Sequence, residues 1–336
     1  MARWILLCLM FFGVLRAEEA RIELVANFNA DTQSLETMLA QMGSKVQLSA
    51  SDLSKYDLSR QKWFAFLRKP LALAASKMVF YNLTSKQAKL ELQRLPKEKL
   101  VLFMWEPPLI LPKMYKEKVQ NLFSKIYTFN DALVDHQRYF KFCYPTLRQM
   151  IQDVIPFKQK KLCALFSSNF SSKREGSLYT ERQAWVAFFE AQQEAGFALY
   201  GRGWRSEEHP SYQGFVEDKL STLKQFRFNI CYENCDNVPG YITEKVFDCF
   251  EAGVVPVYLG PPNVTDYIPK ECFIDPREFA TKEALYTYLK NMSAEEYEGY
   301  LTSIRAFLSS DKAKLFSMEH FVKTFQAAIS DDDSPR

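Results

Sequence analysis

Two charged residues, Glu244 and Lys245, lie at the start of a predicted helix and have side chains suited to binding a nucleotide. The first N–H groups of a helix have no partner within the helix, and its N-terminus carries partial positive charge, so anions bind there. A lysine at this position can pair with phosphate, and a glutamate can accept hydrogen bonds from ribose hydroxyls. These residue types predict a nucleotide site at the helix start.

The surrounding elements form a predicted βαβ unit. An apolar run at residues 228–232 ends in the polar pair Glu233 and Asn234, and a Pro239-Gly240 turn follows. Residues 243–252 have the apolar spacing of a helix that stops at a glycine, and residues 254–259 form a buried-strand run. Because loops of a parallel sheet gather at its carboxyl edge, the polar residues between strand and helix are placed where ligands bind.

Three segments of this region resemble, in order and spacing, the signature of the α-1,3-fucosyltransferases of glycosyltransferase family 10. They are 232–234 (YEN), 240–245 (GYITEK) and 252–260 (AGVVPVYLG), and the pattern continues to residue 275. Each short segment alone could match by accident, but together they are specific. The resemblance implies donor-binding roles for Asn234, Tyr241, Glu244 and Lys245.

The resemblance also implies a fold class and a reaction. The fold is α/β with the GT-B architecture, in which two Rossmann-like domains face a cleft. The expected function is an inverting fucosyltransferase that moves fucose from GDP-fucose to a hydroxyl of an acceptor glycan, with α-1,3 linkage. The acceptor contains N-acetylglucosamine or a related sugar. The alternatives are another GT-B transferase with a different nucleotide sugar, and a non-catalytic module that binds glycan or nucleotide.

Glu106 is the candidate catalytic base. A predicted strand at residues 100–104 stops at Trp105-Glu106-Pro107-Pro108, which leaves Glu106 in a loop at the strand's carboxyl end. The resembled family has a catalytic glutamate in its N-terminal, acceptor-binding domain, and this segment resembles its surroundings. Without the resemblance, Glu106 would be expected to be an ordinary loop charge.

Arg182 is the candidate partner of the donor pyrophosphate. It lies in the first turn of a predicted helix at residues 180–195, after a polar loop that contains Ser168 and Asn169. The resembled family has a Ser-Asn loop followed by such an arginine. Lys173 and Arg174 are alternatives for this role, and without the resemblance Arg182 would be expected to face solvent.

Four segments make up the predicted domain organisation. Residues 1–17 form a signal peptide or short anchor, 18–152 an N-terminal acceptor-binding domain, 153–310 a C-terminal GDP-fucose-binding domain, and 311–336 a C-terminal helix and acidic tail. Strands are expected at 22–28, 46–48, 78–81, 100–105, 125–129, 162–166 and 197–200, with helices at 32–42, 216–226 and through 281–329.

The balance of charge argues against a nucleic-acid-coating protein, and the spacing of potential ligands argues against a metal site. The 43 basic and 40 acidic residues argue against a protein that coats nucleic acid. The three histidines lack zinc-finger spacing, and no aspartate pair follows a strand as a metal-binding pair would. We therefore expect no metal and no cofactor, with GDP-fucose serving as donor substrate.

The N-terminus predicts the secretory route. Arg3, the apolar residues 4–15 and the small residue Ala17 are typical of a signal peptide, and the apolar run is shorter than a membrane-spanning helix. An N-terminal anchor, as in eukaryotic members of the resembled family, would give membrane association. The expected location is the Golgi lumen or membrane in a eukaryote, and the periplasm or envelope in a bacterium.

The sequence leaves the disulfide state open and contains several glycosylation motifs. Six cysteines follow the leader, and both buried thiols and disulfides are compatible with them. Four Asn-X-Ser/Thr motifs begin at Asn82, Asn169, Asn263 and Asn291, and Asn263 is expected to be the least modified because it lies in the signature region.

Overall fold

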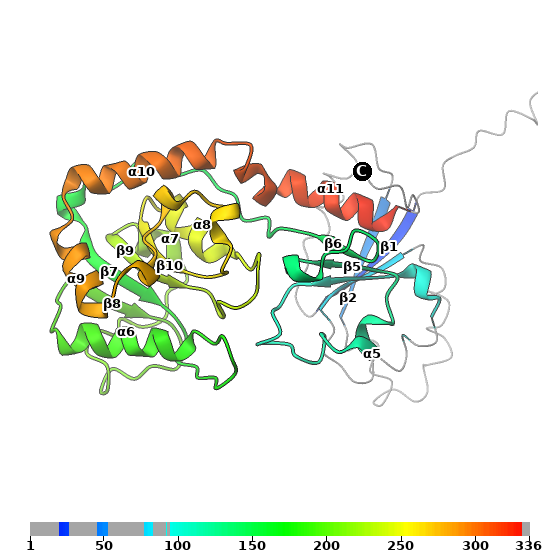
Figure 1. Ribbon diagram of the computed structural model, residues 1–336, viewed down its shortest axis with the longest axis horizontal. Helices are drawn as coiled ribbons and strands as arrows, with labels where there is room; N and C mark the ends of the chain where they lie inside the picture. The colour runs from blue at the N-terminus through cyan, green and yellow to red at the C-terminus, as the bar shows by residue number, and fades with distance from the viewer. Residues whose placement is uncertain (1–19, 27–45, 53–76, 83–91, 93–94, 331–336) are drawn as a thin grey trace, which may run out of the picture. The chain divides into compact units, whose positions relative to one another are not determined.

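The structure, a computed structural model, describes residues 20–26, 46–52, 77–82, 92 and 95–330 (Figure 1). The expected leader at 1–17, the helix at 32–42 and the acidic end of the tail at 331–336 lie outside these residues. In the part that is described, no helix has both the length and the apolar character needed to cross a membrane.

The first sheet has six strands in the order β2-β1-β3-β4-β5-β6. β1 pairs in parallel with β2 and β3, β3 with β4, and β5 with β6. The strands are β1 (Ala20–Ala26), β2 (Val46–Asp52), β3 (Lys77–Tyr81), β4 (Leu100–Met104), β5 (Lys125–Thr128) and β6 (Tyr139–Lys141). The three-residue β6 was not expected from the sequence, because it is half-buried and has no apolar run.

Among the described residues, short helices precede β4, β5 and β6, and the middle of the sheet is buried. Every residue of β3 and β4 is buried, as expected of parallel strands covered on both faces. Phe103 of β4 stacks on Phe325 of the C-terminal helix α11, with ring centroids 6.1 Å apart. The helices are η3 (Lys97–Lys99), α5 (Glu117–Gln120), η4 (Asp131–Leu133) and α11 (Met318–Ile329).

The second sheet has four parallel strands in the order β10-β9-β7-β8. The strands are β7 (Lys161–Phe166), β8 (Phe197–Tyr200), β9 (Phe226–Tyr232) and β10 (Val255–Leu259). Helix α6 (Tyr179–Ala191) follows β7, α7 (Lys219–Leu223) precedes β9, and α8 (Glu244–Glu251) joins β9 to β10. The predicted βαβ unit is therefore confirmed, and with it an α/β fold.

Helices cover both faces of the second sheet. Figure 1 shows α6 on one side and α8 and α10 on the other. Phe189 of α6 and Phe250 of α8 are fully buried in the same apolar core. The remaining helices are η5 (Phe157–Gln159), η6 (Val264–Asp266), η7 (Lys270–Cys272), η8 (Pro276–Glu278), α9 (Lys282–Asn291), α10 (Ala294–Leu308) and η9 (Ala313–Phe316).

The chain divides into two compact units. One comprises Met1–Phe103, Glu117–Lys125 and Phe325–Arg336, and the other comprises Met104–Lys116 and Ile126–Thr324. The loop that carries Glu106 therefore belongs to the unit that contains the second sheet. The functional domain boundaries expected from the sequence stay a prediction.

Candidate active site

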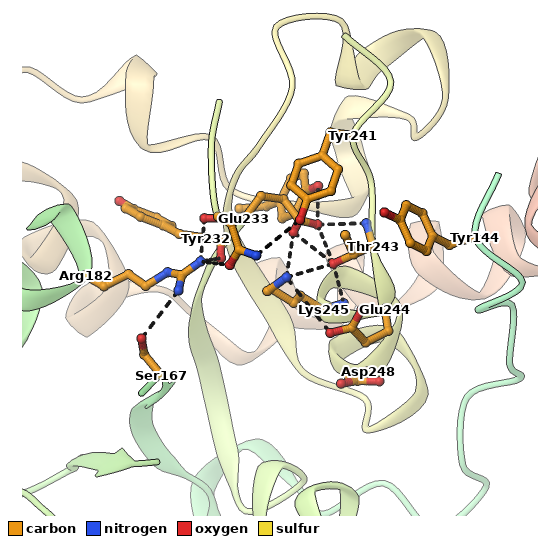
Figure 2. Close-up of polar contacts among 12 residues, drawn as sticks. Tyr144, Ser167, Arg182, Tyr232, Glu233, Tyr241, Thr243, Glu244, Lys245 and Asp248 are labelled. Carbon is orange, nitrogen blue, oxygen red and sulfur yellow. Dashed lines mark hydrogen bonds and ion pairs between the residues drawn. The ribbon is translucent and has the colours of Figure 1, made fainter. Parts of the chain in front are cut away.

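The site is built where strand β9 ends and helix α8 begins (Figure 2). Thr243 is the N-cap of α8, with extended backbone angles of φ −107° and ψ −168°, and its side-chain oxygen accepts a hydrogen bond from the Lys245 N–H at 3.5 Å. This capping explains why the helix begins at Glu244, one residue later than the apolar spacing predicts. Glu244 and Lys245 thus occupy the first turn, as expected from the sequence.

Glu233, the first residue after β9, is a fully buried carboxylate. Its oxygens accept hydrogen bonds from the Thr243 N–H at 2.8 Å and the Thr243 hydroxyl at 2.8 to 2.9 Å. They also accept from the Tyr258 hydroxyl at 3.1 Å and the Lys245 ammonium at 2.8 Å. The end of β9 is therefore tied to the cap of α8 by one side chain.

Lys245 points back from the first turn of α8 toward Glu233 (Figure 2). The Lys245 side chain is 22% exposed, and its ammonium also donates to the Thr243 hydroxyl at 3.0 Å. Burial opposes the charge, but the attraction of Glu233 and Glu244 outweighs it and raises the pKa of Lys245. An ammonium has three donors, so one remains for a ligand.

Arg182 lies in the first turn of α6, as predicted, but it is buried with 6% of its surface exposed. Its guanidinium donates to the carbonyl oxygens of Tyr232 and Glu233 at the end of β9, the first at 2.8 Å. It also donates to the Asn234 side chain at 3.1 Å and approaches the Ser167 hydroxyl at 3.5 Å. Arg182 is thus not the solvent-facing residue that would be expected without the family resemblance.

The acceptors around Arg182 are all uncharged, and within the described residues it makes no ion pair. Burial lowers the pKa of the guanidinium, although Arg182 remains charged at physiological pH. The charged side chains at the site are therefore two cations, Arg182 and Lys245, and two carboxylates, the buried Glu233 and the exposed Glu244. Both cations lie beside a helix N-terminus, whose partial positive charge and unpaired N–H groups favour an anionic ligand.

Asn234 and Tyr241 extend this network. The Asn234 side chain accepts from Arg182 and donates to the Tyr241 hydroxyl at 3.2 Å. Tyr241 is 2% exposed, and its ring packs on Phe129 with centroids 4.9 Å apart. Both predicted donor-binding residues therefore lie beside Arg182 and the start of α8.

Glu244 is the most exposed of the predicted site residues, with 56% of its side chain accessible. Its carboxylate lies 4.0 Å from the Lys245 ammonium. Burial works against ionisation, but Lys245 and the first turn of α8 outweigh it and lower the pKa of Glu244. Glu244 is thus an ionised acceptor available to hydroxyl groups.

Glu106 lies in the loop after β4, which ends at Met104, and is half-buried. Its backbone carbonyl accepts a hydrogen bond from the Tyr115 hydroxyl at 2.9 Å. Burial raises the pKa of the Glu106 carboxyl, Glu244 raises it further, and Lys245 opposes both. The carboxyl therefore lies within electrostatic range of the first turn of α8.

The two alternatives to Arg182 lie in the loop after β7 and are both exposed. Arg174 donates to the backbone carbonyl of Leu109, while Lys173 makes no contact of this kind among the described residues. Neither bonds to the end of β9, whereas Arg182 does so through three hydrogen bonds.

Sequence reasoning missed Glu233 as a member of the site. The available signal was its place directly after an apolar strand, but the same signal is given by many exposed residues. Within the described residues, no three His, Cys, Asp or Glu side chains gather as metal ligands would. The six described cysteines are buried, free thiols.

Solved structures of similar architecture show the fold of the chain. A crystal structure of an α1,3-fucosyltransferase superposes with a TM-score of 0.56 at 13% identity, covering 96% of this chain and 95% of that one. An α-glucosyltransferase solved with UDP and DNA superposes with a TM-score of 0.59 at 10% identity, covering 92% and 99%. The fold is that of the GT-B glycosyltransferases.

Sequence comparison narrows the class to one family. Residues 156–324 match the model of the C-terminal region of glycosyltransferase family 10, the fucosyltransferases, and the chain belongs to this family. This confirms the resemblance of segments 232–234, 240–245 and 252–260.

Curated relatives match over parts of their length. An α-(1,3)-fucosyltransferase of Helicobacter pylori is 36% identical over 76 residues, which is 22% of this chain and 16% of that protein. A 4-galactosyl-N-acetylglucosaminide 3-α-L-fucosyltransferase of Mus musculus is 28% identical over 204 residues, 59% of this chain and 50% of that one. The matched region thus spans half or less of these relatives.

Proposed function

We propose that this chain is a glycosyltransferase that transfers fucose from GDP-fucose to a hydroxyl of an acceptor glycan, with α-1,3 linkage and inversion at the anomeric carbon. Family membership supports the proposal, as do the relatives named α-(1,3)-fucosyltransferases. A structure of similar fold was solved with GDP-fucose, at 15% identity and a TM-score of 0.56. The observation that carries it is the pair of cations, Arg182 and Lys245, that lie at the end of β9 and the start of α8.

In this proposal the donor diphosphate lies at the N-terminus of α8. Lys245 supplies its remaining donor to a phosphate oxygen, and Arg182 adds a second positive charge while it holds Asn234 in place. Glu244 accepts hydrogen bonds from the ribose hydroxyls, for which its exposure suits it. The same two cations stabilise the negative charge that develops on departing GDP.

Glu106 acts as the general base. It removes the proton from the acceptor hydroxyl as that oxygen attacks the anomeric carbon of fucose and the bond to GDP breaks. A base works best when its pKa lies near the operating pH, so the raised pKa of Glu106 suits this role. A positioned base contributes about 10²- to 10⁴-fold to rate.

A donor screen tests the proposal. The purified chain is incubated with N-acetyllactosamine and with GDP-fucose, GDP-mannose, UDP-glucose or UDP-galactose, and product is measured by mass spectrometry. We expect transfer from GDP-fucose alone, and a Glu106→Gln variant that binds GDP normally but transfers at least about a hundredfold more slowly. Transfer from a UDP-sugar instead would support another GT-B transferase, and GDP binding without transfer from any donor would support a binding module.

We further propose that the acceptor is an N-acetylglucosamine-containing glycan and that the chain follows the secretory route. The name of the Mus musculus relative supports the acceptor, and the pattern of residues 1–17 supports the route. Linkage analysis of the product and N-terminal sequencing of the expressed protein test the two statements. A mature chain that begins near Glu18 is expected, and an intact Met1 in a membrane fraction would favour an anchor.

A further inference from the structure

We propose that Glu233 is a positioning residue that holds the Lys245 ammonium in the place where it meets the donor diphosphate. The inference rests on the proposed function, because it concerns the same anion site. Glu233 itself is fully buried and would not touch the donor.

The geometry shows why Lys245 needs such a partner. A lysine side chain has a flexible stem and a point charge, so its ammonium has no fixed direction of its own. Two bonds fix it here, one to Glu233 at 2.8 Å and one to the Thr243 hydroxyl at 3.0 Å. The Thr243 hydroxyl is itself bonded to both Glu233 oxygens, at 2.9 and 2.8 Å. Both anchors of the ammonium therefore depend on one carboxylate.

The buried charge of Glu233 makes its ion pair with Lys245 costly to break. The Glu233 side chain is 0% exposed, so its carboxylate has no water to stabilise it. Of the groups that bond to this carboxylate, Lys245 is the one that carries positive charge; Thr243 and Tyr258 are neutral. Arg182 lies close but bonds to the Glu233 backbone carbonyl. Moving the Lys245 ammonium away would leave the carboxylate uncompensated, so the pair holds Lys245 in place.

A purely structural role for Glu233 is the competing explanation. Its bonds to the Thr243 N–H and hydroxyl tie β9 to α8 whether or not Lys245 is present. The two explanations differ in one respect. If Glu233 acts through Lys245, its effect on donor use disappears when Lys245 is already absent, whereas a structural effect persists.

A double-mutant cycle makes this distinction. Glu233→Gln keeps the shape and removes the charge, Lys245→Met keeps the stem and removes the ammonium, and the third variant combines them. For each, kcat/KM for GDP-fucose and the affinity for GDP are measured. We expect Glu233→Gln to lower kcat/KM at least about tenfold, and the double variant to be no slower than Lys245→Met within about threefold. If the double variant instead loses kcat/KM by the product of the two single-variant losses, the proposal is overturned.

Tyr258→Phe is the matched control. It removes another hydrogen bond to the Glu233 carboxylate, of 3.1 Å, and leaves the bond to Lys245 intact. Its kcat/KM is expected to stay within about threefold of wild type. A loss as large as that of Glu233→Gln would indicate that any damage around Glu233 lowers activity, and would contradict positioning through Lys245.

A readout without substrate separates this inference from the proposed function. NMR titration of the Lys245 ammonium is expected to give a lower pKa in Glu233→Gln than in wild type, because the partner charge is gone. If GDP-fucose is not a donor, the screen fails while this shift still appears. If Glu233→Gln does not fold, Glu233→Asp takes its place in the kinetic cycle alone, because it keeps the charge but withdraws the carboxylate from the Lys245 ammonium. An unchanged Lys245 pKa in Glu233→Gln, or full kcat/KM in Glu233→Asp where that variant is used, would overturn the inference.

Discussion

At the scale of single residues, burial changes what substitution of Arg182 is expected to do. A surface arginine can be removed at little cost to stability, but Arg182 is 6% exposed and joins three consecutive residues at the end of β9. Its loss would leave buried acceptors without partners, and each such group costs about 1–3 kcal/mol.

We predict that Arg182→Lys lowers both stability and donor use. Lysine keeps the charge but cannot reproduce the planar fork that reaches several acceptors. The free energy of unfolding is expected to fall by about 2–4 kcal/mol, and turnover by roughly a hundredfold. Chemical denaturation and steady-state kinetics measure the two effects. Arg205→Ala serves as control because Arg205 is 70% exposed; an Arg182→Lys variant as stable and active as this control would refute the assignment.

The pH dependence of kcat/KM is predicted from the surroundings of Glu106. Its pKa is raised, so activity should be lost, as pH falls, at a higher pH than an ordinary glutamate would give. The pH at which activity is lost on the acid side should fall in Glu244→Gln, because a negative neighbour of Glu106 is lost. Removing Lys245 with Lys245→Met should raise this pH. If the acid-side loss of kcat/KM occurs at the same pH in both variants as in wild type, Glu106 is excluded as the titrating base.

At the scale of elements, the turn before α8 is held by residues far away in the chain. Gly240 has φ +77°, and its N–H donates to the Asn263 side chain at 2.9 Å. The same Asn263 donates to Asp131 at 2.8 Å, and Asp131 is paired with Lys141 at 2.6 Å. These bonds fix the loop that carries Tyr241, and they employ the Asn263 amide that glycosylation would modify.

Gly240→Ala is predicted to be destabilising. An added Cβ would lie 2.4 Å from the Phe129 carbonyl oxygen and 2.5 Å from the Lys141 ammonium, and the positive φ disfavours any side chain. The expected loss is about 1–3 kcal/mol in the free energy of unfolding, with weaker GDP binding. Gly299→Ala in α10 is the control, since its Cβ would meet nothing within 4 Å and alanine favours helix. If the two variants have the same free energy of unfolding, an added Cβ at Gly240 does not clash with Phe129 and Lys141 as expected.

Strands and helices near the site could be predicted from the sequence, whereas the burial of its charged residues could not. Apolar spacing, Gly253 and the Pro239-Gly240 turn predicted β9, α8 and β10 to within one or two residues, because these signals are local. The burial of Arg182 and Glu233 could not be predicted in this way. Each depends on contacts between residues 10 to 52 positions apart, which no local pattern encodes.

At the scale of the whole molecule, one buried lysine joins three segments of the unit that contains the second sheet. Lys160, just before β7, donates to the Gly253 carbonyl after α8 and to the Tyr297 hydroxyl of α10 at 3.1 Å. Burial lowers the pKa of Lys160 to about 8, although Glu298 opposes the shift.

The lowered pKa predicts a pH-dependent stability. Between pH 8 and the ordinary lysine pKa of 10.5, the unfolded chain binds more protons at this position than the folded one. Raising the pH through this window should therefore raise the free energy of unfolding of wild type relative to Lys160→Met. Urea denaturation of both proteins at pH 7.5, 9 and 10 measures the difference. A difference independent of pH would show that Lys160 titrates normally.

The central claim is that the start of α8, with Lys245 and Arg182, binds the diphosphate of a guanine nucleotide. Isothermal titration of the wild-type chain with GDP, GMP, guanosine and UDP tests it most directly. The account predicts that GDP binds most tightly, that guanosine binds at least about a hundredfold more weakly, and that Lys245→Met removes most of this difference. Equal affinities for GDP and guanosine, or an unchanged ratio in Lys245→Met, would contradict it.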